Sequence, residues 1–343
     1  MSSDSIGRIK TLTKYTILLT ITVIMLGAYT RLSDAGLGCP DWPGCYGQLV
    51  VPTQEAQINQ AMRLFPNHTI EPNKAWLEMI HRYVAGALGL CVFAIALMCL
   101  FTRQVPKKLP LFLLILVIGQ AMLGMWTVTM KLMPIVVMGH LLGGFSLLSL
   151  LVLLYQRLNF QAQPFSQIRR ASLVRFVAAL ALCVLIIQVM LGGWTSANYA
   201  ALMCTALPFC EGDWQQYLDF SNAFQWSHQN IESYEFGVLD YPARMTIHVS
   251  HRVGALVTAC IVMLLAAQLL LQDNVRLKRV AIGLIFLLGI QILLGISNVV
   301  FQLPLAIAVL HNIGAALLLA NLVYTNYIVW QFRPELCTKG VYT

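Results

Sequence analysis

Eight apolar runs, each long enough to cross a membrane, constrain the fold of this chain more than any other feature. They lie near residues 15–33, 76–102, 109–130, 134–158, 172–195, 243–271, 277–300 and 303–332. A helix needs about 20 apolar residues to cross roughly 30 Å of hydrocarbon. With 58% hydrophobic and 10% charged residues, the 343-residue chain is too apolar for a soluble fold. The sequence therefore predicts an all-α integral membrane protein with eight transmembrane helices.

Four groups of residues recur in the two halves of the chain at a nearly constant displacement. They are Met25-Leu26-Gly27 with Met190-Leu191-Gly192 and Cys39 and Cys45 with Cys204 and Cys210 (165 apart), His81-Arg82 with His251-Arg252 (170), and Gln120, Gly124, His140 and Gly143 with Gln291, Gly295, His311 and Gly314 (171). Displacements that agree within six residues indicate an internal duplication. We therefore expect two duplicated four-helix bundles, residues 1–165 and 166–343, each with an equivalent site.

The distribution of charge predicts the orientation of the chain. Basic residues gather in both tails and after the second, fourth and sixth runs, whereas most acidic residues lie in the loops 34–75 and 196–242. The positive-inside rule then places both termini in the cytoplasm and the two long loops outside. Neither a cleavage site nor an Arg-rich transit segment is present, which favours an uncleaved first span in a bacterial inner membrane. The net charge of +8 follows from this orientation, so we expect no nucleic-acid partner.

Four histidines lie at one depth of the predicted membrane domain. His81, His140, His251 and His311 each fall about five to eight residues into a helix that runs inward from the outer side, which is roughly 8 to 12 Å below the outer end. A histidine in a membrane is costly unless it faces the bundle and finds a partner. Two imidazoles on separate helices of a four-helix bundle form an axial pair for a heme. The alternative is that each only hydrogen-bonds to a neighbouring helix, and the duplicated layer disfavours it.

The two halves differ one turn before the first histidine of each. Glu78 stands three residues before His81, where the second half has His248 before His251. A carboxylate one turn from a metal ligand can accept or relay protons. The alternative is a structural ion pair with Arg82. This difference suggests that one site carries chemistry and the other supports it.

Four of the nine cysteines lie in the outer loops, where an oxidising compartment permits disulfides. Cys39 and Cys45, like Cys204 and Cys210, enclose five residues. The first pair has two nearby charges, Arg31 and Asp41, that the second half lacks. A nearby cation favours thiolate and eases thiol exchange, so we expect the first pair to differ in role from the second.

The first outer loop resembles that of a known family. The string Thr30-Arg31-Leu32-Ser33-Asp34-Ala35-Gly36-Leu37-Gly38-Cys39-Pro40-Asp41-Trp42-Pro43, with Cys45 and Glu78-Met79-Ile80-His81-Arg82, strongly resembles the heme A synthase family of cytochrome oxidase assembly. The resemblance covers essentially the whole chain. It implies oxidation of a methyl substituent of heme O to a formyl group, which gives heme A for terminal oxidases. The isoprenoid tail of that substrate suits a site within the membrane.

The resemblance also implies roles for the singled-out residues. The N-terminal half would be the substrate site, with His81 and His140 bracketing heme O and Glu78 as the acidic residue needed for activity. The C-terminal half would hold a heme b cofactor with His251 and His311 as axial ligands of its iron. Cys39 and Cys45 match a pair implicated in electron or heme handling, redox-active or structural, while Cys204 and Cys210 would form a structural disulfide. Expected partners are heme O, heme O synthase, an electron donor or acceptor, and membrane lipid.

Other classes of protein fit the sequence less well. The strongest alternative is a diheme b-type electron-transfer protein, but moving electrons across a bilayer needs hemes at different depths. A thiol-disulfide oxidoreductase is disfavoured because the cysteine spacing is C-x5-C. A transporter would place its site nearer the midplane, and a prenyltransferase would need clustered aspartates in the membrane region.

Overall fold

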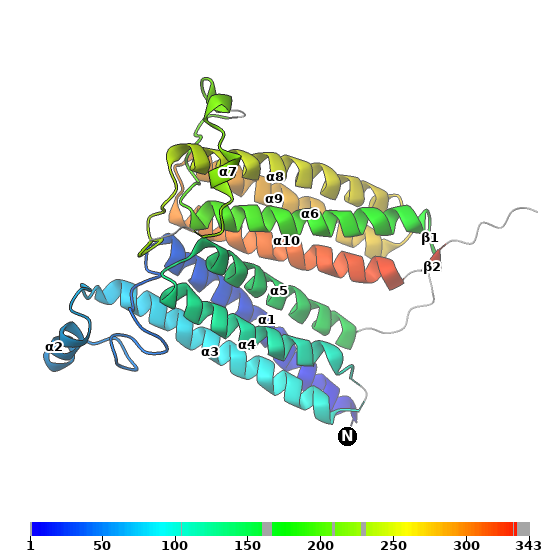
Figure 1. Ribbon diagram of the computed structural model, residues 1–343. Helices are drawn as coiled ribbons and strands as arrows, with labels where there is room; N and C mark the ends of the chain where they lie inside the picture. The colour runs from blue at the N-terminus through cyan, green and yellow to red at the C-terminus, as the bar shows by residue number, and fades with distance from the viewer. Residues whose placement is uncertain are drawn as a thin grey trace, which may run out of the picture.

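The computed structural model describes residues 2–103, 105–159, 167–207, 210–227, 231–331 and 333–334. Its eight long helices are α1 (Ser2–Leu32), α3 (Pro72–Phe101), α4 (Lys108–Thr129), α5 (Pro134–Leu158), α6 (Ala171–Ala197), α8 (Tyr241–Leu270), α9 (Val275–Val300) and α10 (Leu305–Gln331) (Figure 1). All eight are long and apolar enough to cross a membrane, so the predicted all-α multi-pass membrane fold is confirmed.

Short elements occupy the connections between these helices. They are α2 (Glu55–Leu64), the 3-10 helix η1 (Trp214–Tyr217), α7 (Phe220–Ala223), and the strands β1 (Gln167–Ile168) and β2 (Arg333–Pro334), which pair in parallel. The sequence analysis did not predict them. The expected boundary between residues 165 and 166 lies outside the described residues.

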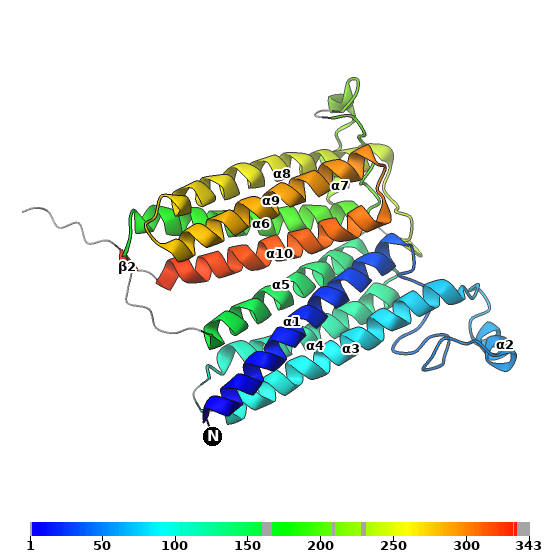
Figure 2. The same cartoon turned by 180° about the vertical axis from the view of Figure 1, so that it is seen from behind.

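The long helices form two rings of four, which lie one above the other in Figure 1. In the first ring α1 and α4 each pack against both α3 and α5; in the second, α6 and α9 each pack against both α8 and α10. Helices α3 and α5 are therefore diagonal partners, as are α8 and α10. The rings meet where α1 and α5 pack against α10 and where α5 packs against α6. The view from behind shows α3 and α8 on opposite outer sides of the molecule (Figure 2).

The backbone repeats with the displacements found in the sequence. Asp34 and Tyr199, which follow the first helix of each ring, both have positive φ and are 165 residues apart. The turn between α4 and α5 has two consecutive left-handed residues, Lys131 and Leu132, and the turn between α9 and α10 has them 171 residues later. Equivalent turns join equivalent helices, so the sequence repeat is also a repeat of backbone conformation.

Several helices begin before their apolar runs do. Helix α1 begins at Ser2 instead of near residue 15, with an ion pair between Asp4 and Arg8 on its first turns. Helix α3 begins with a proline, and Asp240 caps α8 by accepting a hydrogen bond from the Ala243 amide at 3.1 Å. Hydropathy detects only the part of a helix that faces hydrocarbon, whereas caps and local ion pairs extend helices into water.

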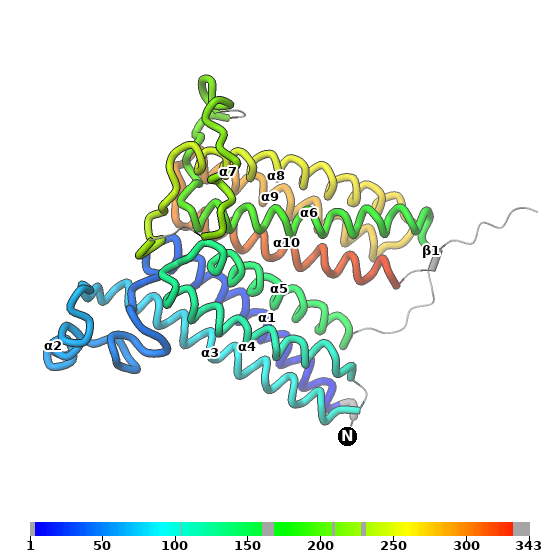
Figure 3. Tube along the Cα trace, viewed as in Figure 1, coloured from blue at the N-terminus to red at the C-terminus, as the bar shows by residue number. Residues whose placement is uncertain are grey.

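The long connections 33–71 and 198–240 lie at the same end of the molecule, and the N-terminus with β1 and β2 lies at the other (Figures 1 and 3). Large apolar side chains on the outer helices face outward, including Leu90 on α3 and Phe286 on α9, which are 72% and 65% exposed. Such a girdle suits contact with lipid.

Candidate functional site

The four predicted histidines gather near the end of the bundle that carries the long loops. His81 and His251 are residues 9 and 10 after the first residue of α3 (81 − 72) and α8 (251 − 241); His140 and His311 are each residue 6 after the first of α5 (140 − 134) and α10 (311 − 305). They therefore lie on the two diagonal helices of each ring. His81 interacts electrostatically with His140, and His251 with His311, so the rings bring them together as two pairs.

Each histidine packs against a glycine of a neighbouring helix. A Cβ atom added at Gly27 on α1 would lie 2.8 Å from Cε1 of His81, and one at Gly124 on α4 would lie 3.3 Å from Cε1 of His140. In the second ring the corresponding distances are 3.1 Å from Gly192 to His251 and 3.2 Å from Gly295 to His311. These are the glycines of the sequence repeat. Their missing side chains are what allows the imidazoles to lie close to the adjacent helix.

Glu78 is held by two partners on the side of α3 toward the first loop. Its Oε2 atom accepts a hydrogen bond from the Cys39 amide at 2.9 Å, and its Oε1 atom pairs with Nη2 of Arg82. The Glu78 side chain is 6% exposed and that of Arg82 is 12% exposed. The ion pair that was the alternative reading of Glu78 is therefore present. It ties the carboxylate to the loop that covers His81.

The two arginines of the His-Arg repeats have the same task. Arg82 donates hydrogen bonds to the carbonyls of Asp41 at 3.0 Å and Gly44 in the first loop. Arg252 donates to the carbonyls of Cys204 at 2.6 Å and Ala206 at 2.8 Å in the second. Each arginine follows a site histidine directly. The same helix turn thus positions the imidazole and fastens the loop above it.

His248, the counterpart of Glu78, has a different partner. Its Nδ1 atom lies 2.8 Å from the backbone carbonyl of Ala200, and the side chain is buried. It can donate to a carbonyl, but it offers the second ring no carboxylate. The predicted difference between the halves is therefore present as a difference in hydrogen bonding.

Both outer cysteine pairs form disulfides, Cys39–Cys45 with Cα atoms 4.8 Å apart and Cys204–Cys210 with Cα atoms 5.3 Å apart. Cys39 and Cys45 are fully buried under their loop. Tyr46 beside them donates from its hydroxyl to the Thr69 carbonyl at 3.1 Å, and burial raises the pKa of its phenol.

Arg31 does not lie beside the first disulfide as the sequence analysis expected. Its guanidinium donates to the Tyr199 hydroxyl at 2.8 Å and to the Ser196 carbonyl at 3.2 Å, and it stacks over the Tyr199 ring at 4.4 Å. The cation that fastens the Cys39–Cys45 loop is instead Arg82. Sequence proximity misled here, because α1 ends at the interface between the rings and its last turn faces α6.

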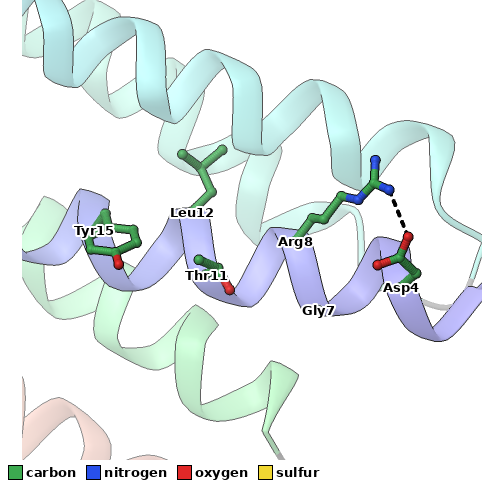
Figure 4. A pocket seen from close by; sticks show the side chains of 6 residues that line it. All are labelled: Asp4, Gly7, Arg8, Thr11, Leu12 and Tyr15. Atoms are coloured by element: carbon green, nitrogen blue, oxygen red, sulfur yellow. Dashed lines mark hydrogen bonds and ion pairs between the residues drawn. The ribbon is translucent and has the colours of Figure 1, made fainter.

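A shallow open depression lies far from the histidines, at the beginning of α1. It is lined by Asp4, Gly7, Arg8, Thr11, Leu12 and Tyr15, and Figure 4 shows the Asp4–Arg8 ion pair along it. These residues stand near the N-terminus, at the end of α1 opposite Gly27. The depression contributes nothing to the histidine sites.

The histidine pairs fit a heme. Nδ1 of His81, His140 and His311 is buried without a hydrogen-bond partner in the described part of the chain. Imidazole nitrogens left in that state suit a metal ligand, and facing histidines on diagonal helices provide the two axial positions of a heme iron.

Sequence reasoning missed three glutamines that lie beside these histidines. Gln188 Nε2 is 3.0 Å from Nδ1 of His251, and Gln291 Nε2 is 3.2 Å from Nε2 of His311. Gln120 lies against Gly143, close to His140. The signal was present, since each glutamine stands four residues before the glycine that contacts its histidine.

Comparison with known proteins agrees with this geometry. Residues 10–323 match a family described as cytochrome oxidase assembly protein. A heme A synthase of Shewanella oneidensis is 58% identical over 93% of this chain and 96% of its own length. Heme A synthases of Wolbachia pipientis and Caulobacter vibrioides are 24% and 26% identical over 93% and 92% of this chain, and over 92% and 93% of their own lengths. The chain therefore belongs to the heme A synthase family of cytochrome oxidase assembly proteins.

Proposed function

We propose that this protein is a heme A synthase, an oxidoreductase that converts a methyl group of heme O to the formyl group of heme A. The observation that carries the proposal is the arrangement of four histidines as two diagonal pairs at one end of a duplicated membrane bundle. It is supported by the 58% identity to a heme A synthase over nearly the full chain. A membrane site also suits the apolar tail of heme O.

In this proposal the first ring, residues 1–165, binds heme O between His81 and His140. The second ring, residues 166–343, holds a heme b through His251 and His311. Heme iron supplies the redox chemistry when bound, and the protein supplies ligands and orientation. Glu78 stands closest to that chemistry among the carboxylates, one turn before His81, and is placed to take up or hand on protons. An electron donor or acceptor and heme O synthase are the expected partners.

The same proposal places the protein in a bacterial inner membrane with both termini in the cytoplasm and the heme sites near the periplasmic side. Its support is the positive-inside charge distribution together with the bacterial relatives. The two disulfide-bonded loops stand at the end assigned to the oxidising side.

Heme extraction from the purified protein tests this function. Heme B together with heme O or heme A is expected; heme B alone would favour the electron carrier. We further predict that His251→Ala and His311→Ala each remove the low-spin absorption of heme b, because a bis-imidazole iron needs both ligands. The corresponding His81→Ala and His140→Ala variants should keep it. An unchanged spectrum in both second-ring variants would refute the assignment.

A further inference from the structure

Three of the four site histidines face a glutamine, and the fourth does not. The pattern Gln-x3-Gly begins at Gln120, Gln188 and Gln291, and its glycine contacts His140, His251 and His311 respectively. On α1 the equivalent position, four residues before Gly27, is Val23. The site of His81 is therefore the exception within this chain.

A second exchange accompanies the first. The residue three positions after the histidine is Gly143, Gly254 or Gly314 at the glutamine-bearing sites, but Val84 after His81. In each of the three sites the carboxamide of the glutamine occupies the space that a Cβ on that glycine would need. Glutamine and glycine thus belong together, since any larger side chain would displace the carboxamide. Both positions are valine beside His81.

The second ring uses its glutamines to hold the imidazoles. Nε2 of Gln188 lies 3.0 Å from both Nδ1 and the backbone carbonyl oxygen of His251. Nε2 of Gln291 lies 3.2 Å from Nε2 of His311 and 3.0 Å from its carbonyl oxygen. Each carboxamide contacts one ring nitrogen and leaves the other for a ligand. In the first ring, as far as the structure describes it, Nδ1 of His81 and of His140 has no such partner.

We propose that Gln188 and Gln291 are positioning residues that fix the imidazoles of His251 and His311, and that Val23 and Val84 leave His81 free to release its heme. This inference rests on the proposed function, in which the second ring keeps a cofactor and the first exchanges a substrate for a product. A hydrogen bond to the second nitrogen of a ligating histidine fixes the ring and raises its basicity. A resident cofactor needs that support, whereas a product must leave.

Removal of the glutamines tests one half of the proposal. Gln188→Leu and Gln291→Leu should still bind a low-spin heme, because both histidines remain, but should lose it to apomyoglobin about 10- to 100-fold faster than the wild type. Their electron paramagnetic resonance g-values should also spread as the rings lose a fixed orientation. The matched control is Gln268→Leu on α8, a buried glutamine beyond contact with the histidines, which should release heme at the wild-type rate.

Transfer of the glutamine to the first ring tests the other half. The double variant Val23→Gln with Val84→Gly recreates the pair found at the other three sites, and should slow release of heme from the first ring by about 10- to 100-fold. Product released per folded protein should fall accordingly, while the second-ring heme stays unchanged. Val84→Gly alone, which adds space without a carboxamide, should behave as the wild type.

The outcomes separate this inference from the function on which it rests. If the low-spin heme survives His251→Ala and His311→Ala, the proposed function fails. If those variants lose it but the leucine variants and the double variant release heme at wild-type rates, only the role of the glutamines is refuted. Should a leucine variant fail to fold, Gly314→Ala displaces the Gln291 carboxamide without removing it and should give the same faster release.

Discussion

At the scale of single residues, Glu78 joins three parts of the first site. Its carboxylate accepts from the Cys39 amide, pairs with Arg82, and stands one turn before His81. A carboxylate in these surroundings has a structural and a chemical role at once. A substitution that preserves shape and hydrogen bonding while removing the charge can tell them apart.

We predict that Glu78→Gln keeps folding and heme b content but abolishes heme A formation. The amide retains an oxygen for the Cys39 amide, yet it can no longer carry a proton between groups. Product per folded protein is the measurement. His248→Ala, the counterpart, should reduce it less, since His248 contacts only the Ala200 carbonyl. Normal heme A from the Glu78 variant would leave it a purely structural residue.

The two disulfides should also separate by function. Cys204→Ala or Cys210→Ala should mainly lower thermal stability or heme b retention. The six-residue separation places the stabilisation at the low end of the typical range of about 2–4 kcal/mol. Cys39→Ala or Cys45→Ala should impair heme A production more than protein level, since Glu78 bonds directly to the Cys39 amide. Identical effects for both pairs, measured as product per folded protein, would show that both only fasten loops.

At the scale of the helix, the repeated glycines set how closely helices approach the histidines. We predict that Gly192→Ala on α6 destabilises the second site, because its Cβ would lie 3.1 Å from Cε1 of the buried His251. Overpacking of this kind costs about 1–3 kcal/mol. The measurement is heme b occupancy and melting temperature in detergent.

Gly289→Ala on α9 is the matched control for this change. A Cβ there meets nothing within 4 Å, so both occupancy and melting temperature should stay at wild-type values. Equal behaviour of the two alanine variants would mean that the contact between Gly192 and His251 does not constrain the site.

At the scale of the whole molecule, the loop end of the interface between the rings depends on Arg31. It joins the end of α1 to the end of α6 through the Tyr199 ring and hydroxyl and the Ser196 carbonyl. This contact links a residue of the first half to its counterpart 165 positions later, because Ser196 occupies in the repeat the position of Arg31. The duplication is therefore asymmetric where its copies meet.

We predict that Arg31→Ala lowers the free energy of unfolding by about 1.5–3 kcal/mol, the contribution typical of hydrogen bonds to a charged group. Thermal unfolding in detergent measures it. Arg63→Ala, at an exposed position on α2, should leave the melting temperature unchanged. If the two variants melt at the same temperature, Arg31 does not hold the rings together.

Much of this architecture could be predicted from the sequence. Apolar runs of membrane length require helices, because hydrocarbon offers no partner for backbone groups. The repeat displacement placed His81, His140, His251 and His311 at equivalent depths, and the structure sets them nine, ten or six residues from their helix starts. The cysteine pairs were recognisable because spacing and compartment are properties of the chain itself.

Only the tertiary structure decided which groups touch. Which helices are diagonal, and that Arg31 reaches across to Tyr199 while Arg82 fastens the first loop, depend on packing between distant segments. The glutamines show the limit most clearly: the spacing Gln-x3-Gly is visible in the sequence, but its meaning appears only when α6 lies on α8 and α9 on α10. Sequence periodicity determines the face and depth of a residue along its own helix, whereas a contact between helices depends on how both rotate and cross.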